Sequence, residues 1–234
     1  AVANQLSQGW VPPPKQSQRT RKVLLVHAHP LPGSFSTALA SAVRRGLEKG
    51  GAEVTLLNLY SMKFDPRLSA DERRRYLGPT ERDPQLPPYP TVPRDVRKHV
   101  EALKTHDAVV FVYPTWWFNM PAMLKGYFDR TLVPGPEGAW DFPSGGKELI
   151  ASNGLVPKLT NVKRIAGIST YGAPWSIATL AGDNGRNCIA TAIRPVFAPD
   201  CTCLWLGLYQ LDNCSLKARS DFLDRVRVAI RDEF

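Results

Sequence analysis

The sequence predicts an α/β fold in which a doubly wound, five-stranded parallel sheet lies between two layers of helices. Three observations lead to this prediction. Five apolar runs of strand length alternate along the chain with segments whose apolar residues recur at helical spacing. The runs are nearly continuous in apolar residues, as is typical of parallel strands covered on both faces. At 234 residues, the chain has a suitable length for one large α/β domain.

The first β-α-β unit follows residues 1–20, a Gln- and Pro-rich stretch that we expect to form a flexible arm before a single domain, residues 21–234. The first predicted strand is residues 22–28, and the second is residues 53–59. The helix between them has one apolar face, formed by Leu39, Ala42, Val43, Gly46 and Leu47. Gly50 and Gly51 end this helix. The crossover makes the two strands parallel and right-handedly connected.

Residues 60–93 contain seven prolines, which exclude a long regular element. We expect an ordered loop there, with a short helix over residues 69–77. A helix with Val96, Val100 and Leu103 on one face follows, and residues 107–113 are the third strand.

Three consecutive rings, Trp116, Trp117 and Phe118, follow the third strand. Doubly wound sheets bind their ligands at this end of the strands. The rings either fill the core beneath the loop or form an apolar surface for a flat partner. Because consecutive side chains cannot all point the same way, the second interpretation is favoured for the group. Asn119 as N-cap and Pro121 in the first turn predict the start of the next helix.

The remaining elements complete the alternation of strands and helices. Residues 132–160 are rich in Gly and Pro and are predicted to form loops. The fourth strand is residues 163–169, and the fifth is residues 201–208. A closing helix carries Leu223, Val226 and Ile230 on its apolar face.

Composition and motifs argue against several functional classes. The net charge is +9, but the basic residues are dispersed and no cluster is interleaved with aromatic residues, which disfavours nucleic-acid binding. No GxGxxG fingerprint or Walker loop is present, and the nearest approach, Ser144–Lys147, lacks the upstream Gly. No apolar run is long enough to cross a membrane, and no signal peptide is visible at the first residues.

The four cysteines, at positions 188, 201, 203 and 214, show no spacing typical of a metal site, and we expect no metal. They are best explained as buried thiols in a reducing compartment, so we expect a cytoplasmic protein without membrane insertion.

Three loops should meet at the carboxyl edge of the sheet. The first, residues 29–36, offers Ser hydroxyls and the start of a helix, which together suit a phosphate group. The second is the aromatic loop, and the third is the Gly-containing turn of residues 169–175. A phosphate site beside aromatic walls and a Gly-bearing turn fits a flavin.

These segments resemble the flavodoxin-like NAD(P)H:quinone oxidoreductases. The similarity spans roughly residues 22–210, and residues 113–130, which resemble the isoalloxazine loop and its helix, are its most specific part. Residues 26–36 resemble the family's first loop, and residues 169–172 resemble its third turn. The resemblance implies a homodimer with a flavin at each subunit interface. It also implies two-electron reduction of a quinone or similar small aromatic acceptor by NADH or NADPH, in ping-pong order.

The resemblance also implies the roles of individual residues. Those placed along the flavin's phosphates and ribityl chain are His29, Ser34, Phe35 and Ser36. Those placed around the isoalloxazine ring are Pro114, Thr115, Trp116, Trp117, Phe118, Thr170, Tyr171 and Gly172. Those placed on the acceptor side are Trp140, Phe142 and Trp175. FAD is the expected cofactor, with FMN as the alternative.

One segment departs from the family pattern. Animal members carry a Tyr and a His after the third turn, where this chain has Ile177 and Ala181, followed by the matching pair Gly182-Asp183. Tyr171 is therefore the candidate catalytic proton donor. Two rival functions remain. One is a flavodoxin-type electron carrier or a regulatory flavoprotein subunit of an ion-transport system, and the other is a nucleic-acid-binding module.

Overall fold

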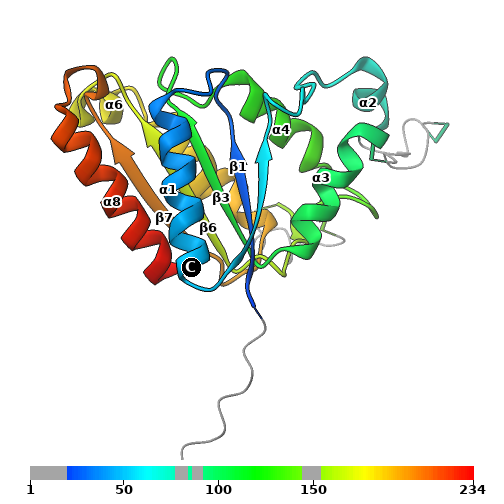
Figure 1. The fold of residues 1–234 in the computed structure, drawn as a ribbon. Helices are drawn as coiled ribbons and strands as arrows, with labels where there is room; N and C mark the ends of the chain where they lie inside the picture. Colours follow the sequence, from blue (N-terminus) through cyan, green and yellow to red (C-terminus); the bar gives the residue numbers. More distant parts are fainter. Residues whose placement is uncertain (1–19, 77–83, 86–91, 144–153) are drawn as a thin grey trace, which may run out of the picture.

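A central parallel sheet organises the chain, as the ribbon in Figure 1 shows. The computed structural model describes residues 20–76, 84–85, 92–143 and 154–234. The predicted arm therefore lies almost entirely outside the described residues, and Ser144–Lys147 lies outside them as well.

The sheet contains the five predicted strands, in the order β2-β1-β3-β6-β7. Their bounds are Lys22–His27 (β1), Glu53–Asn58 (β2), Ala108–Pro114 (β3), Arg164–Thr170 (β6) and Thr202–Leu208 (β7). Every pairing is parallel. The direction of winding reverses between β1 and β3, and ligands bind beside such a switch point in open α/β sheets.

Helices cover both faces of the sheet. The longer ones are Phe35–Lys49 (α1), Arg94–Thr105 (α3), Ala122–Thr131 (α4) and Leu216–Glu233 (α8). In Figure 1, α1 and α8 lie side by side on one face, and α3 and α4 lie on the other side of the sheet. This confirms the three-layer prediction.

Alternation along the strands divides the core between these two layers. In β1, Val23 and Leu25 pack into the cluster formed with α1 and α8, whereas Leu24 and Val26 pack into the cluster formed with α3 and α4. All four side chains are fully buried. A strand with both faces covered has no polar side, which explains why its sequence is continuously apolar.

Shorter elements connect this framework. A helix at Ala70–Arg75 (α2) confirms the short helix expected in the proline-rich segment, and a capping box between Ser69 and Glu72 starts it. Two short strands, Trp140–Asp141 (β4) and Val156–Pro157 (β5), pair in antiparallel fashion. A short turn of 3-10 helix, Leu211–Asn213 (η3), precedes α8.

Two features of the sequence interpretation need correction. The N-cap of α4 is Pro121, and Asn119 instead accepts a hydrogen bond from the Met120 N–H through its side chain. Residues 175–196, to which no element was assigned, are a run of short helices: Trp175–Leu180 (α6), Asn184–Asn187 (α7), Cys188–Ile193 (η1) and Arg194–Val196 (η2). Their brevity explains the omission, because a helix of one or two turns shows no lasting periodicity.

Among the described residues, no helix is both long and apolar enough to cross a membrane. The four cysteines are free, but only Cys201 is buried and the other three are half-buried. Cys201 and Cys203 both pack into the core cluster on the face of the sheet that α3 and α4 cover, as their alternation in the sequence indicates.

Candidate functional site

The aromatic loop folds into a tight two-residue turn. The backbones of Trp116 and Asn119 exchange two hydrogen bonds, at 2.9 and 3.0 Å. Trp117 and Phe118 lie between them with φ angles of 51° and 56°, in the left-handed region. Turns of this kind usually carry Asn or Gly at these positions, because a side chain there is strained. The Trp117 side chain is 96% exposed, so packing within the chain does not compensate for this strain. Strained backbone held at a sheet edge is typical of ligand-binding loops.

The third turn lies directly beside this aromatic turn. The Thr115 N–H donates to the Thr170 carbonyl at 2.7 Å, and the hydroxyls of Thr115 and Ser169 are 2.9 Å apart. Pro114 is paired with Thr170 at the end of β3 and β6. These contacts hold the second and third loops in a fixed position relative to each other.

A cavity of about 270 Å³ lies between the two loops. It is lined by Thr115, Trp117, Phe118, Tyr171, Gly172 and Ala173. The N–H groups of Gly172 and Ala173 have no hydrogen-bond partner among the described residues. The cavity therefore combines aromatic walls with two free backbone donors.

The first loop leaves the N–H groups of Phe35 and Ser36 free and uses its hydroxyls internally. Ser34 is the N-cap of α1 and accepts from the Thr37 N–H at 3.1 Å. The buried Ser36 hydroxyl lies 3.3 Å from Nε2 of His27. Phe35 and Ser36 begin the helix, where N–H groups have no intrahelical acceptor. An anion at this loop would meet the N–H groups rather than the Ser hydroxyls, and Phe35 packs its ring against the core near α8.

The first and second loops meet through His29 and Trp116, whose ring centroids are 6.0 Å apart. Partial burial lowers the pKa of His29, and its Nδ1 accepts a hydrogen bond from the Leu31 N–H at 3.0 Å. Burial lowers the pKa of the neighbouring His27 to about 4, and His29 adds a smaller repulsion. At neutral pH both rings are uncharged.

The three residues expected on the acceptor side do not line the cavity within one chain. Trp140 donates its indole N–H to the Leu132 carbonyl at 2.8 Å, and its ring lies 4.8 Å from that of Phe142. Trp175 begins α6 and is exposed, as are Ile177 and Leu180 on the same helix. The sequence interpretation thus identified five of the six residues that line the cavity. It missed Ala173, whose position beside Gly172 in the turn was the available signal.

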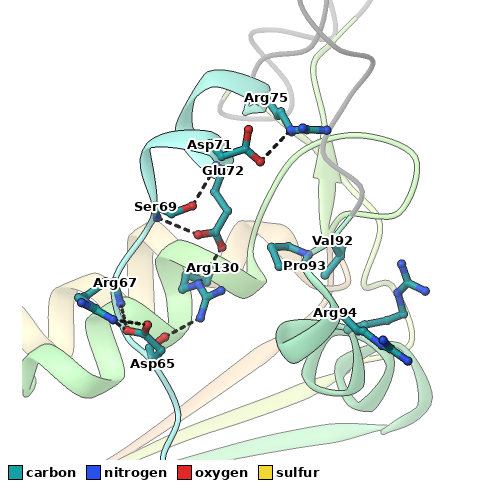
Figure 2. Close-up of a pocket in the computed structure, with 11 residues that line it drawn as sticks. Asp65, Arg67, Ser69, Asp71, Glu72, Arg75, Val92, Pro93, Arg94 and Arg130 are labelled. Carbon is teal, nitrogen blue, oxygen red and sulfur yellow. Dashed lines mark hydrogen bonds and ion pairs between the residues drawn. The ribbon is translucent and has the colours of Figure 1, made fainter.

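A larger cavity, of about 610 Å³, lies elsewhere, between α2, α3 and α4 (Figure 2). At its wall the buried Arg130 donates to Glu72 at 2.8 Å, to Asp95 at 2.9 Å and to the Asp65 carbonyl at 2.7 Å. Arg67 pairs with Asp65, and these hydrogen bonds hold the pKa of that carboxyl below its usual range. These pairs tie the proline-rich segment to α4, so we interpret the cavity wall as structural.

The smaller cavity and the first loop, which meets the second through His29 and Trp116, together offer groups that fit a flavin. The free N–H groups of Phe35 and Ser36 suit a phosphate, the rings of Trp117 and Phe118 suit a flat ring system, and the free N–H groups of Gly172 and Ala173 suit its polar edge. Among the described residues, no group of three or more potential ligands could hold a metal ion.

The sheet order and these three loops define a doubly wound α/β protein with a cavity at the carboxyl edge of its strands. A family model described as flavodoxin-like fold matches residues 21–187, and the chain belongs to this family.

Curated relatives include the ribosyldihydronicotinamide dehydrogenase [quinone] of Rattus norvegicus, 32% identical over 133 residues, which cover 53% of this chain and 55% of the relative. The NAD(P)H dehydrogenase [quinone] 1 of the same organism is 33% identical over 127 residues, which cover 49% and 44%. The chain thus spans about half the length of the curated relatives it matches.

Solved structures agree on the fold. The NAD(P)H:quinone oxidoreductase from Methanothermobacter marburgensis has a TM-score of 0.71 at 22% identity, covering 92% of this chain and 97% of that one. An FMN-dependent NADH-azoreductase from Bacillus anthracis, in complex with FMN, has a TM-score of 0.65 at 16% identity, covering 92% and 99%.

Proposed function

We propose that this protein is a flavin-dependent NAD(P)H oxidoreductase that transfers two electrons to quinones or similar aromatic acceptors. The observation that carries this proposal is the cavity at the carboxyl edge of the sheet. There, strained aromatic residues face a turn with free backbone donors. The quinone reductases among the relatives support the same reaction class.

When bound, the flavin supplies the hydride chemistry, and the chain's own residues supply binding, orientation and exclusion of water. Trp117 and Phe118 would provide an apolar wall for the isoalloxazine ring. The free N–H groups of Gly172 and Ala173 stabilise negative charge at the ring's polar edge. The free N–H groups of Phe35 and Ser36 bind phosphate, with His29 at the rim of the site.

We further propose that two copies of the chain form a dimer with a site at each interface. The support is the surface at this edge, because Trp117 on the aromatic turn and Trp175 on α6 are both exposed. Trp140 and Phe142 do not line the cavity of their own chain. We therefore propose that in the dimer they cover the cavity of the other copy. Sedimentation of the purified protein as a monomer at micromolar concentration would contradict this assembly.

Resemblance in the three loops favours FAD as the cofactor, with FMN as the alternative. Release of the cofactor by heat, followed by chromatography against both standards, distinguishes them. Recovery of neither flavin, together with a failure of the apoprotein to bind either one, would overturn the proposed function.

Steady-state kinetics test the reaction itself. A single site that takes NAD(P)H and then the acceptor gives parallel lines in double-reciprocal plots. Intersecting lines would indicate that both substrates bind together and would contradict the ping-pong order.

The alternative function is one-electron transfer, as in a flavodoxin-type carrier or a regulatory flavoprotein subunit. A stable semiquinone spectrum during reductive titration would favour the carrier, whereas direct bleaching of the oxidised spectrum supports the enzyme. Binding to duplex DNA that weakens with salt would instead support the nucleic-acid alternative suggested by the +9 charge.

A further inference from the structure

The Tyr171 side chain is held in place by a hydrogen bond from its hydroxyl and by a second ring stacked on its face. Its side chain is 2% exposed, and its hydroxyl donates to Oδ1 of Asp183 at 2.7 Å. Tyr209 stacks on the ring, with centroids 4.4 Å apart and planes inclined by 20°. Burial is the largest cause of a raised pKa at Tyr171, and the bond to Asp183 adds to it, so the phenol stays protonated.

The backbone of Tyr171 also forms hydrogen bonds within the chain, so neither its N–H nor its carbonyl is free to bind a ligand. Its N–H donates to the Leu208 carbonyl at 2.8 Å, and its carbonyl accepts from the Leu211 N–H at 2.9 Å. The free donors in this turn are therefore those of Gly172 and Ala173, directly after Tyr171. Any rotation of Tyr171 would reorient both of them.

Asp183 is fixed by its own surroundings rather than by Tyr171 alone. It precedes α7 with φ 41°, in the left-handed region, and its side chain is largely buried. Its N–H donates to the Ala178 carbonyl of α6 at 2.9 Å, and its carbonyl accepts from the Asn187 N–H at 3.0 Å. Arg186 approaches the second carboxylate oxygen at 3.9 Å. Asp183 is therefore a rigid anchor that joins the cavity turn to α6.

We propose that Asp183 is a positioning residue for the flavin site, acting through the Tyr171 hydroxyl to aim the N–H groups of Gly172 and Ala173 at the flavin's polar edge. This inference rests on the proposed function, because it assigns the two donors to a bound flavin. In this proposal the Tyr171 hydroxyl holds the turn in place and does not donate a proton directly to the acceptor.

The test compares two variants that break the contact with one that preserves it. Tyr171→Phe removes the hydroxyl and keeps the ring, and Asp183→Ala removes the acceptor. Asp183→Asn keeps an oxygen that can accept the bond. Tyr127→Phe is the matched control, because it removes a tyrosine hydroxyl that is equally buried but has no partner among the described residues.

Fluorescence titration of the apoprotein with FMN and FAD measures the dissociation constant of each. We expect Y171F and D183A each to raise it about tenfold, the usual scale for loss of a hydrogen bond to a charged group. D183N should stay within about threefold of wild type. The double variant Y171F/D183A should be no weaker than the weaker single variant, because both remove one contact.

Amide hydrogen exchange of the apoprotein adds a readout that needs no flavin. Loss of the contact in Y171F should speed exchange at position 171 and at Leu211 about tenfold, whereas Y127F should leave both rates unchanged. Y171F carries the test alone if D183A does not fold.

The outcomes separate the two proposals. If wild type binds flavin and Y171F binds it as tightly as Y127F does, the positioning role is overturned while the proposed function stands. If wild type binds neither FMN nor FAD, both are overturned.

Discussion

Gly126 on α4 lies directly against Pro66, so that a Cβ built at Gly126 would be 2.1 Å from the Pro66 carbonyl oxygen. This contact seats the proline-rich segment on the helix that follows the aromatic turn. We expect Gly126→Ala to destabilise the fold by about 1–3 kcal/mol, because overpacking outweighs the better helix propensity of alanine. Urea denaturation measures the change. Gly33→Ala is the control, since a Cβ at Gly33 meets nothing within 4 Å. Equal stabilities of the two variants would show that the segment moves away at little cost.

Substitution of Arg130 is a second test of the contact between the proline-rich segment and α4. Its side chain is 6% exposed and contacts Glu72 and Asp95. Arg130→Met leaves the largely buried Glu72 carboxylate without its cationic partner, and we expect a loss of about 3–5 kcal/mol in unfolding free energy. Arg44→Met removes one partner of an exposed pair with Glu48 and should cost less than about 1 kcal/mol. A comparable loss in both variants would contradict a special role for the buried network.

The strained turn predicts a difference between two substitutions at one position. Trp117→Gly and Trp117→Ala both remove the exposed ring, but only glycine adopts a φ of 51° without steric cost. We expect the glycine variant to be more stable than the alanine variant by about 1 kcal/mol. Thermal denaturation of the apoprotein measures this difference. If alanine is equally stable, the turn relaxes out of the left-handed region and carries no strain.

His99 predicts a pH dependence of stability. Burial lowers its pKa to about 4, and its ring lies 5.1 Å from that of Phe64 and 5.7 Å from that of Tyr127. In the unfolded chain the His99 ring takes up a proton near pH 6.5, whereas in the folded chain it does so only near pH 4. The free energy of unfolding therefore falls as the pH drops from 6.5 toward 4. Between pH 7 and pH 5 this costs about 2 kcal/mol per buried histidine.

His27 behaves in the same way, with a pKa lowered to about 4. His99→Phe should therefore remove the contribution of one buried histidine from the slope of unfolding free energy against pH, while keeping the ring contacts. Denaturation curves at pH 7, 6 and 5 measure this slope. An unchanged slope in the variant would mean that the pKa of His99 is the same in the folded and the unfolded chain.

Much of the fold could be predicted from the sequence, because strands buried on both faces and helices with one apolar face carry their own periodicity. The positions of β1 and β3 and the end of α1 follow from such patterns. The meeting of the three loops was also predictable, since the carboxyl ends of parallel strands lie along one edge of a sheet. Thr115, Trp117, Phe118, Tyr171 and Gly172 of the second and third loops line one cavity, and His29 of the first loop contacts Trp116 of the second.

The sequence by itself thus determined the layers, the strands and the edge at which the site lies, because local periodicity and chain direction are enough to specify them. Only the tertiary structure decided how the site is held. The left-handed turn at Trp117 opposes local backbone preference, and Arg130 joins segments that local patterns cannot relate. Tyr171 and Asp183 lie twelve residues apart and meet because α6 folds back over the end of β6. Such contacts depend on several segments at once, and their geometry exists only after the sheet has assembled.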